Sequence, residues 1–219
     1  MRILLASADP DEVRWATERQ WADGIFLGPD SSFTSATEYD AERIAEAARL
    51  VEGTTFVSVH SVHTEEICRE ARELVRMAEQ STVVLPLMDD AVLATSVLAA
   101  EGVDVALNFV HNGAQALLAA KAGATGVIVP FADHEAFGQS GMDALVEIAQ
   151  VLARSAPECD LIATGARGAS DISACARAGV DALVLTSAAL SAMLVHPLTD
   201  RGVDRYLTEV ARFTHQGTN

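Results

Sequence analysis

The chain has 219 residues, of which 50% are hydrophobic, and a formal net charge of −16. This apolar content excludes a disordered chain, and the excess of acids argues against nucleic acid or anionic membranes as partners, because binding to phosphates relies on Lys and Arg. No segment approaches the ~20 consecutive apolar residues of a membrane helix, and acidic residues follow the first apolar run too soon for a signal peptide. We therefore expect a cytoplasmic protein that binds neither nucleic acid nor membrane.

Short apolar runs recur along the whole chain, and each is typical of a strand buried on both faces of a parallel sheet. They are four to six residues long and rich in Val, Ile, Leu and Ala. In chain order they are Ile3–Ala6, Gly24–Leu27, Thr55–His60, Thr82–Leu87, Asp104–Phe109, Gly126–Pro130, Leu161–Thr164 and Ala182–Thr186.

The segments between these runs begin and end with residues that are typical of helix termini. Asp9 precedes a proline and two acids, which is the pattern of an N-cap followed by a first turn that suits the helix dipole. Thr64 opens a helix that we expect to run to about Gln80, and Gly123 and Gly179 each end a helix just before a strand. A last helix, about Asp200 to Phe213, follows the eighth run, and we expect residues 214–219 to be frayed.

Alternating strands and helices leave an open doubly wound sheet or a closed barrel as the two main choices. No Gly-x-Gly-x-x-Gly turn follows the first strand, which argues against an open sheet of the dinucleotide-binding kind. The length suits a compact barrel, and no linker rich in Pro, Gly or Ser divides the chain. We therefore predict an α/β protein, a single (β/α)8 TIM barrel over residues 1–219 with an additional C-terminal helix.

Three motifs follow one another in the middle of the chain: a helix at Gly113–Ala124, a strand end at Val129–Phe131 and a glycine-rich loop at Gly138–Gly141. They resemble the fifth helix, the sixth strand and the following loop of the transaldolase and fructose-6-phosphate aldolase family. Further matches at Gly24, Pro29 and His196-Pro197 extend the resemblance from Met1 to about Thr214. The resemblance implies the same barrel fold.

Members of this family bind the carbonyl of a ketose or dihydroxyacetone to a fourth-strand lysine as a Schiff base, because an iminium stabilises the carbanion formed on C–C cleavage. The resemblance places this lysine at Leu85. The only lysine of the chain is Lys121, near the end of the fifth helix, where we expect an exposed side chain outside the barrel. The resemblance thus implies a divergent member without the Schiff-base lysine.

Other functional positions of the family also carry different side chains here. The resemblance places Ala6 at an acid/base aspartate, Phe26-Leu27-Gly28-Pro29 at a Thr-Thr-Asn-Pro motif, Phe109 at a threonine or serine, Phe131 at a tyrosine of the aldolases, His134 at an arginine that holds the sugar phosphate, and Ala166 at the serine partner of that arginine. Most of these changes run from polar to apolar. We therefore predict an apolar ligand-binding mouth lined by Ala6, Phe26, Gly28, Leu85, Phe109 and Phe131, which argues against sugar-phosphate aldol chemistry.

Polar side chains remain at the predicted strand ends, where barrels of this kind place their active sites. Arg167 could hold a carboxylate or other anion, with His134 as a second donor or a general acid. Asn108 and His60 are further candidates for acid/base function. The alternative for Arg167 is a surface ion pair with Asp133 or Asp171. We predict no cofactor and no metal, because the three cysteines fit no metal-binding spacing.

Two functions remain open from the sequence. The first is a repurposed enzyme that acts on a less polar carbonyl or carboxylic compound by acid/base chemistry without lysine. The second is a non-catalytic family member that binds a ligand or serves as a partner subunit in an oligomer, with the mouth plugged by Phe26, Leu85 and Phe109. The resemblance also implies a homo-oligomer, a pentamer or decamer, in which the terminal helix packs on a neighbour.

Overall fold

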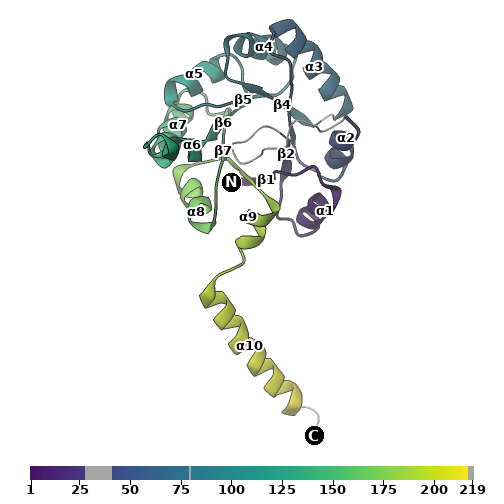
Figure 1. Cartoon of the computed structure of the whole chain (residues 1–219), viewed down its shortest axis with the longest axis vertical. Helices are drawn as coiled ribbons and strands as arrows, with labels where there is room; N and C mark the ends of the chain where they lie inside the picture. The colour runs from purple at the N-terminus through teal and green to yellow at the C-terminus, as the bar shows by residue number, and fades with distance from the viewer. Residues whose placement is uncertain (28–40, 79, 217–219) are drawn as a thin grey trace.

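The computed structural model describes residues 1–27, 41–78 and 80–216. Side chains are described for all of these residues except 41–43 and 213–216. Parallel strands form a closed barrel in chain order, and Figure 1 shows them as an inner ring. The strands are β1 (Arg2–Leu5), β2 (Gly24–Leu27), β3 (Thr55–Ser58), β4 (Ser81–Pro86), β5 (Val105–Asn108), β6 (Gly126–Pro130), β7 (Asp160–Thr164) and β8 (Ala182–Leu185). This confirms the predicted (β/α)8 TIM barrel, while Gly28 and Pro29 fall outside the described residues.

Helices follow the strands and, except for α10, lie around the barrel (Figure 1). They are α1 (Pro10–Glu18), α2 (Ala41–Arg49), α3 (Thr64–Met77), α4 (Asp89–Ala100), α5 (Gly113–Lys121), α6 (Phe131–Ala136), α7 (Gly141–Ser155), α8 (Ala169–Ala178), α9 (Ser187–Ala192) and α10 (Pro197–Gln216). None of the described helices has both the length and the apolar content needed to cross a bilayer. The helix α10 is longer than the predicted terminal helix and extends away from the barrel.

A side chain caps the first helix, as predicted, and another caps the fifth. Asp9 Oδ1 accepts the backbone N–H groups of Asp11 and Glu12, at 2.8 and 3.3 Å. Asn112 Oδ1 accepts the N–H of Gln115 at 2.9 Å. These bonds satisfy N–H groups that have no partner within the helix. Sequence periodicity was less accurate at helix ends, since α3 ends at Met77 rather than near Gln80.

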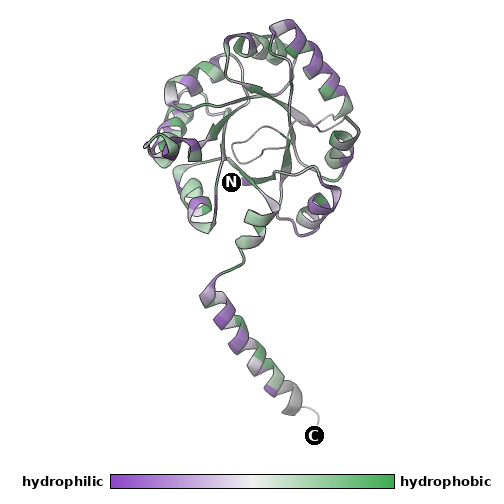
Figure 2. Cartoon of the chain, viewed as in Figure 1, coloured by the Kyte–Doolittle hydropathy of each residue, from purple (hydrophilic) through white to green (hydrophobic). Residues whose placement is uncertain are grey.

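Successive residues of each strand alternate between two apolar layers, as the pleat of a strand requires. One layer lies between the strands and the helices and includes Leu5, Ile25 and Leu107. The other fills the barrel interior, and its members are Leu4, Ala6, Phe26, Phe56, Val84, Ala106, Ile128, Ile162, Ala182 and Val184. Figure 2 shows the corresponding pattern, with hydrophobic strands inside and hydrophilic residues on the outer faces of the helices.

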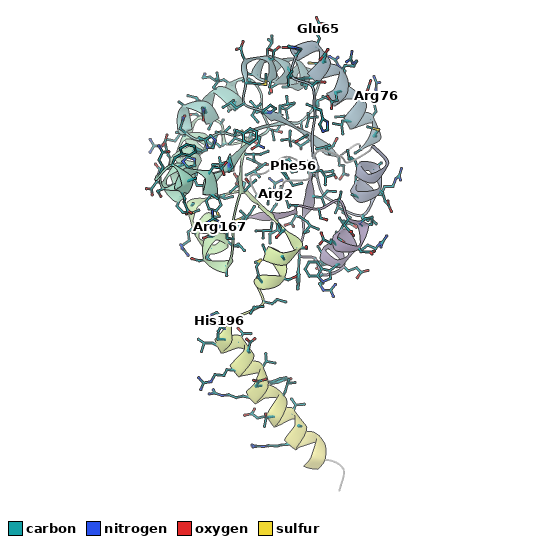
Figure 3. The ribbon with its side chains drawn as sticks, in the orientation of Figure 1. Arg2, Phe56, Glu65, Arg76, Arg167 and His196 are labelled. Carbon is teal, nitrogen blue, oxygen red and sulfur yellow. The ribbon has the colours of Figure 1, made fainter. Side chains whose placement is uncertain are left out.

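The strand register divides the barrel interior into stacked layers of four side chains from alternate strands. One layer contains Leu4, Phe56, Ala106 and Ile162, and the next contains Phe26, Val84, Ile128 and Val184. The rings of Phe26 and Phe56 lie 6.2 Å apart at 32°, and Figure 3 shows Phe56 inside the ring of strands. The lower and middle parts of the barrel are therefore a packed apolar core.

Candidate functional site

The uppermost layer of the odd-numbered strands carries three polar side chains, in contrast to the layers below it. By register and alternation it consists of Ala6, Ser58, Asn108 and Thr164. The hydroxyl oxygens of Ser58 and Thr164 are buried and have no hydrogen-bond partner among the described residues. Asn108 Oδ1 accepts the N–H of Phe109 at 2.7 Å. Because an unpartnered buried hydroxyl costs about 1–3 kcal/mol, this layer is suited to receive a polar group.

Strand alternation corrects three positions that the resemblance assigned to functional residues of the family. Leu85 is fully buried, but it belongs to the layer between strands and helices, and the inward-facing neighbour on β4 is Val84. On β5 the inward-facing residue is Asn108, while Phe109 follows the strand. On β7 it is Thr164, and Ala166 lies in the next loop. A shift of one residue reverses the side of a strand to which a side chain points.

The predicted apolar lining is therefore only partly correct. Ala6 and Phe26 face the barrel interior, as expected. Phe131 does not, because it begins α6 and packs in the layer between strands and helices. Phe56, which the sequence analysis did not single out, fills the interior together with Phe26. Phe56 and Ser58 are two residues apart on the same strand, so their side chains point to one face. This spacing is the sequence signal that indicates Phe56.

His134 forms a pair with His111 of the β5–α5 loop. His134 lies on α6 and is 7% exposed, and its Nε2 is 3.1 Å from Nδ1 of His111 in the β5–α5 loop. The two ring centroids are 5.0 Å apart. Burial lowers the pKa of His111, and the neighbouring His134 lowers it further, against a smaller opposing effect of Asp133. A neutral imidazole has one donor and one acceptor nitrogen, so such a pair can relay a proton.

Arg167 is exposed and pairs with a carboxylate other than the two that the sequence suggested. Its guanidinium lies 3.5 Å from Oε2 of Glu135, and its backbone N–H donates to Asp171 at 2.9 Å. Figure 3 shows Arg167 beside α8. Exposed ion pairs of this kind contribute little to stability, so the guanidinium is available to an anion.

A cavity of about 640 Å³ lies where the loops after β6, β7 and β8 meet. Its lining includes Asp133, Gly165, Arg167 and Thr186, but not His134. His134 and Arg167, which the sequence analysis placed in one site, therefore lie in different surroundings. Arg167 lines the cavity, whereas the ring of His134 contacts His111. The loops after the seventh and eighth strands are a frequent site for anionic groups in these barrels.

His60 is held at the surface by Glu70 of α3. Its side chain is 64% exposed and its Nδ1 lies 3.4 Å from Glu70 Oε1, while Glu70 accepts the backbone N–H groups of His60 and Ser61 at 2.8 and 2.9 Å. Burial alone would raise the pKa of Glu70, but the hydrogen bonds from Ser61 and His60 together lower it. The described residues contain no group of three or more His, Cys, Asp or Glu that could hold a metal ion.

Lys121 is exposed at the last position of α5. In a (β/α)8 barrel each helix runs back from the carboxyl end of one strand to the amino end of the next. The amine of Lys121 therefore lies at the end of the barrel opposite to Asn108 and Thr164. The amino group of Met1, which precedes β1, lies at that same opposite end.

Comparison with known proteins matches residues 31–218 to the family described as Transaldolase/Fructose-6-phosphate aldolase. A "probable transaldolase" of Hyphomonas neptunium is 30% identical over 97% of this chain and 98% of the relative. Another, of Heliobacterium modesticaldum, is 32% identical over 95% of this chain and 97% of the relative. A solved structure of mandelate oxidase matches with a TM-score of 0.57 at 16% identity, over 86% of this chain and 66% of the oxidase, which supports the barrel fold alone.

Proposed function

Because the chain belongs to the transaldolase/fructose-6-phosphate aldolase family, we propose that it retains the ligand site of the barrel but does not perform Schiff-base aldol chemistry. The observation that carries this proposal is the location of Lys121, the only lysine, on the outer ring of helices. An iminium at the mouth needs a side-chain amine there. Val84, the inward-facing residue of β4 next to the polar layer, cannot supply one.

The polar layer supports binding of a small compound with one or two oxygen atoms. The hydroxyl groups of Ser58 and Thr164 can each donate a hydrogen bond to a carbonyl or carboxylate oxygen. Immediately below them, Phe26 and Val84 present apolar surface. We propose a less polar carbonyl or carboxylic compound as the ligand, because a polyol would leave hydroxyl groups unpaired against that surface.

The pair of His111 and His134 supports acid/base chemistry without lysine. One ring can accept a proton while the other donates, and burial keeps His111 neutral to lower pH than an ordinary histidine. In this proposal His134 is the acid/base group and His111 orients it. Arg167 holds an anionic group in the neighbouring cavity.

The alternative is a non-catalytic binding protein, and one observation favours it. Phe26 and Phe56 fill the barrel interior below the polar layer, which limits how deeply a substrate can enter. Both functions predict ligand binding at Thr164, but only the enzyme predicts proton transfer. The test uses NMR to measure whether ligand protons next to the carbonyl group exchange for deuterium. Exchange that is abolished in His134→Gln would support the enzyme function. Saturable binding with no exchange would support the binding protein.

We further propose that α10 packs against a second copy of the chain. The helix has exposed apolar side chains at Val203, Leu207 and Val210, which recur on one stripe, with Tyr206 beside it. Most of the stability of a protein helix comes from tertiary packing of its apolar face, and on α10 this face is exposed. A homo-oligomer would supply that packing.

The direct test of the proposed function is reduction with borohydride in the presence of dihydroxyacetone or fructose 6-phosphate, followed by peptide mass spectrometry. We expect no adduct within the barrel, while a lysine-dependent aldolase treated in parallel acquires one. The variant Lys121→Arg controls for reaction at the surface. An adduct accompanied by aldol cleavage, and lost in Lys121→Arg, would contradict the proposal.

A further inference from the structure

The β5–α5 loop, residues 109–112, is held in a strained conformation by contacts on three sides. Phe109 has a φ of +63°, a region that costs a bulky residue of order 1–3 kcal/mol. Next to it, the N–H of Val110 donates to the carbonyl oxygen of Ile128 at 3.1 Å, and the N–H of His111 donates to Gln115 Oε1 at 2.7 Å. The third contact joins the ring of His111 to His134 on α6. Strain of this kind persists only while the surroundings maintain it.

We infer that the hydrogen bond between His111 and His134 holds this loop against α6 only while at least one of the two rings is neutral, so that acidification releases the loop. The bond needs a donor nitrogen on one ring and a lone pair on the other. Two imidazolium rings are both donors, and their charges would repel each other at the observed separation of 3.1 Å. Release of the ring removes one of the contacts that hold Phe109 in its left-handed conformation.

The charged groups around the pair set the direction of the pH dependence. Asp133 on α6 favours protonation, but burial and the second histidine outweigh it, so the pKa of His111 lies below its ordinary value of 6.5. Glu135 on α6 is already paired with Arg167. On α7, Glu147 accepts the N–H of Gly113 at 2.9 Å. A lowered pKa means that this contribution to stability is present above pH 6.5 and is lost as the pH falls through the lowered value.

Amide hydrogen exchange measured by NMR between about pH 8 and pH 5 tests the inference, with exchange corrected for its intrinsic pH dependence. The amides of Val110 and His111 report on the loop, because their hydrogen bonds are formed only when it is closed. We expect their protection to fall by about tenfold or more at the acidic end. The amide of Val83, bonded to the carbonyl oxygen of Asp104, should keep its protection.

A matched pair of variants separates the proton-dependent contact from general acid sensitivity. In His134→Gln the side chain can still donate and accept but cannot become charged, so loop protection should not vary with pH. His63→Gln alters an exposed histidine at the start of α3 and should behave like the wild type. Should His134→Gln fail to fold, His111→Gln tests the same point. Loop protection that is independent of pH in the wild type, or an unchanged transition in the glutamine variants, would overturn the inference.

Discussion

At the scale of single residues, the chemistry of the barrel mouth depends on which side chains point inward. Val84 and Leu85 are neighbours in the chain, yet Val84 faces the interior and Leu85 faces the helices. Asn108 and Phe109 differ in the same way, since only Asn108 lies on the inward face of its strand. The mouth is therefore less apolar than the sequence suggested, because Ser58, Asn108 and Thr164 lie in one layer.

Lysine substitutions on β4 test this assignment. In Val84→Lys the new amine extends from the interior toward the polar layer, where we expect it to form a Schiff base with dihydroxyacetone that borohydride traps. Burial should also lower the pKa of this amine, which favours the nucleophilic neutral form. In the matched variant Leu85→Lys the amine is buried between strand and helices, so we expect no adduct and lower thermal stability. Equal trapping in both variants would contradict the inward assignment of Val84.

The unpartnered hydroxyl of Thr164 predicts opposite effects on stability and on binding. Thr164→Val removes a buried hydroxyl without a described partner, so the free energy of unfolding should rise by about 1 kcal/mol, while affinity for small carboxylic acids falls. Thr95→Val is the control, because Thr95 Oγ1 donates to the carbonyl oxygen of Ala91 at 2.7 Å. That variant should lose roughly 1 kcal/mol and keep the affinity. Urea unfolding and calorimetric titration measure both quantities, and a loss of stability in Thr164→Val would argue against this reading.

At the scale of secondary-structure elements, the position of His134 depends on close packing between α6 and α7. Gly141 is the first residue of α7, and a Cβ atom there would meet the carbonyl oxygen of Phe131 at 2.1 Å. Phe131 is the first residue of α6, three residues before His134. The glycine at the end of the predicted glycine-rich loop thus allows α7 to approach the start of α6, and α6 carries the buried histidine.

The variant Gly141→Ala tests this packing. The added methyl group must displace backbone rather than a flexible side chain, so we expect a loss of about 1–3 kcal/mol in the free energy of unfolding. The NMR signals of His134 should shift as α6 moves. Gly202→Ala, at a helical glycine with open space around it, should instead be neutral or stabilise α10. Similar stabilities for both variants would show that α6 and α7 can separate without cost.

At the scale of the whole molecule, the side chains of α10 that the structure describes are exposed, and Figure 1 shows the helix extending away from the barrel. If it packs on a second copy, Leu207→Asp should convert an oligomer into smaller species, because the charge falls in the middle of the apolar stripe. Arg205→Ser, on the opposite face of the helix, should leave the mass unchanged. Light scattering after size exclusion measures the mass. A monomeric wild type across micromolar concentrations would contradict the proposed assembly.

The sequence by itself determined the repeated strand and helix pattern and the lack of any lysine other than Lys121, and the chain length favoured the closed barrel that the structure has. These features follow from hydrophobic periodicity, from local capping at residues such as Asp9 and Asn112, and from composition. Only the tertiary structure decided that Val84 rather than Leu85 faces inward, that Ser58 and Thr164 share a layer, and that His134 meets His111. The reason is that these relations depend on strand register and barrel stagger, which join residues far apart in the chain.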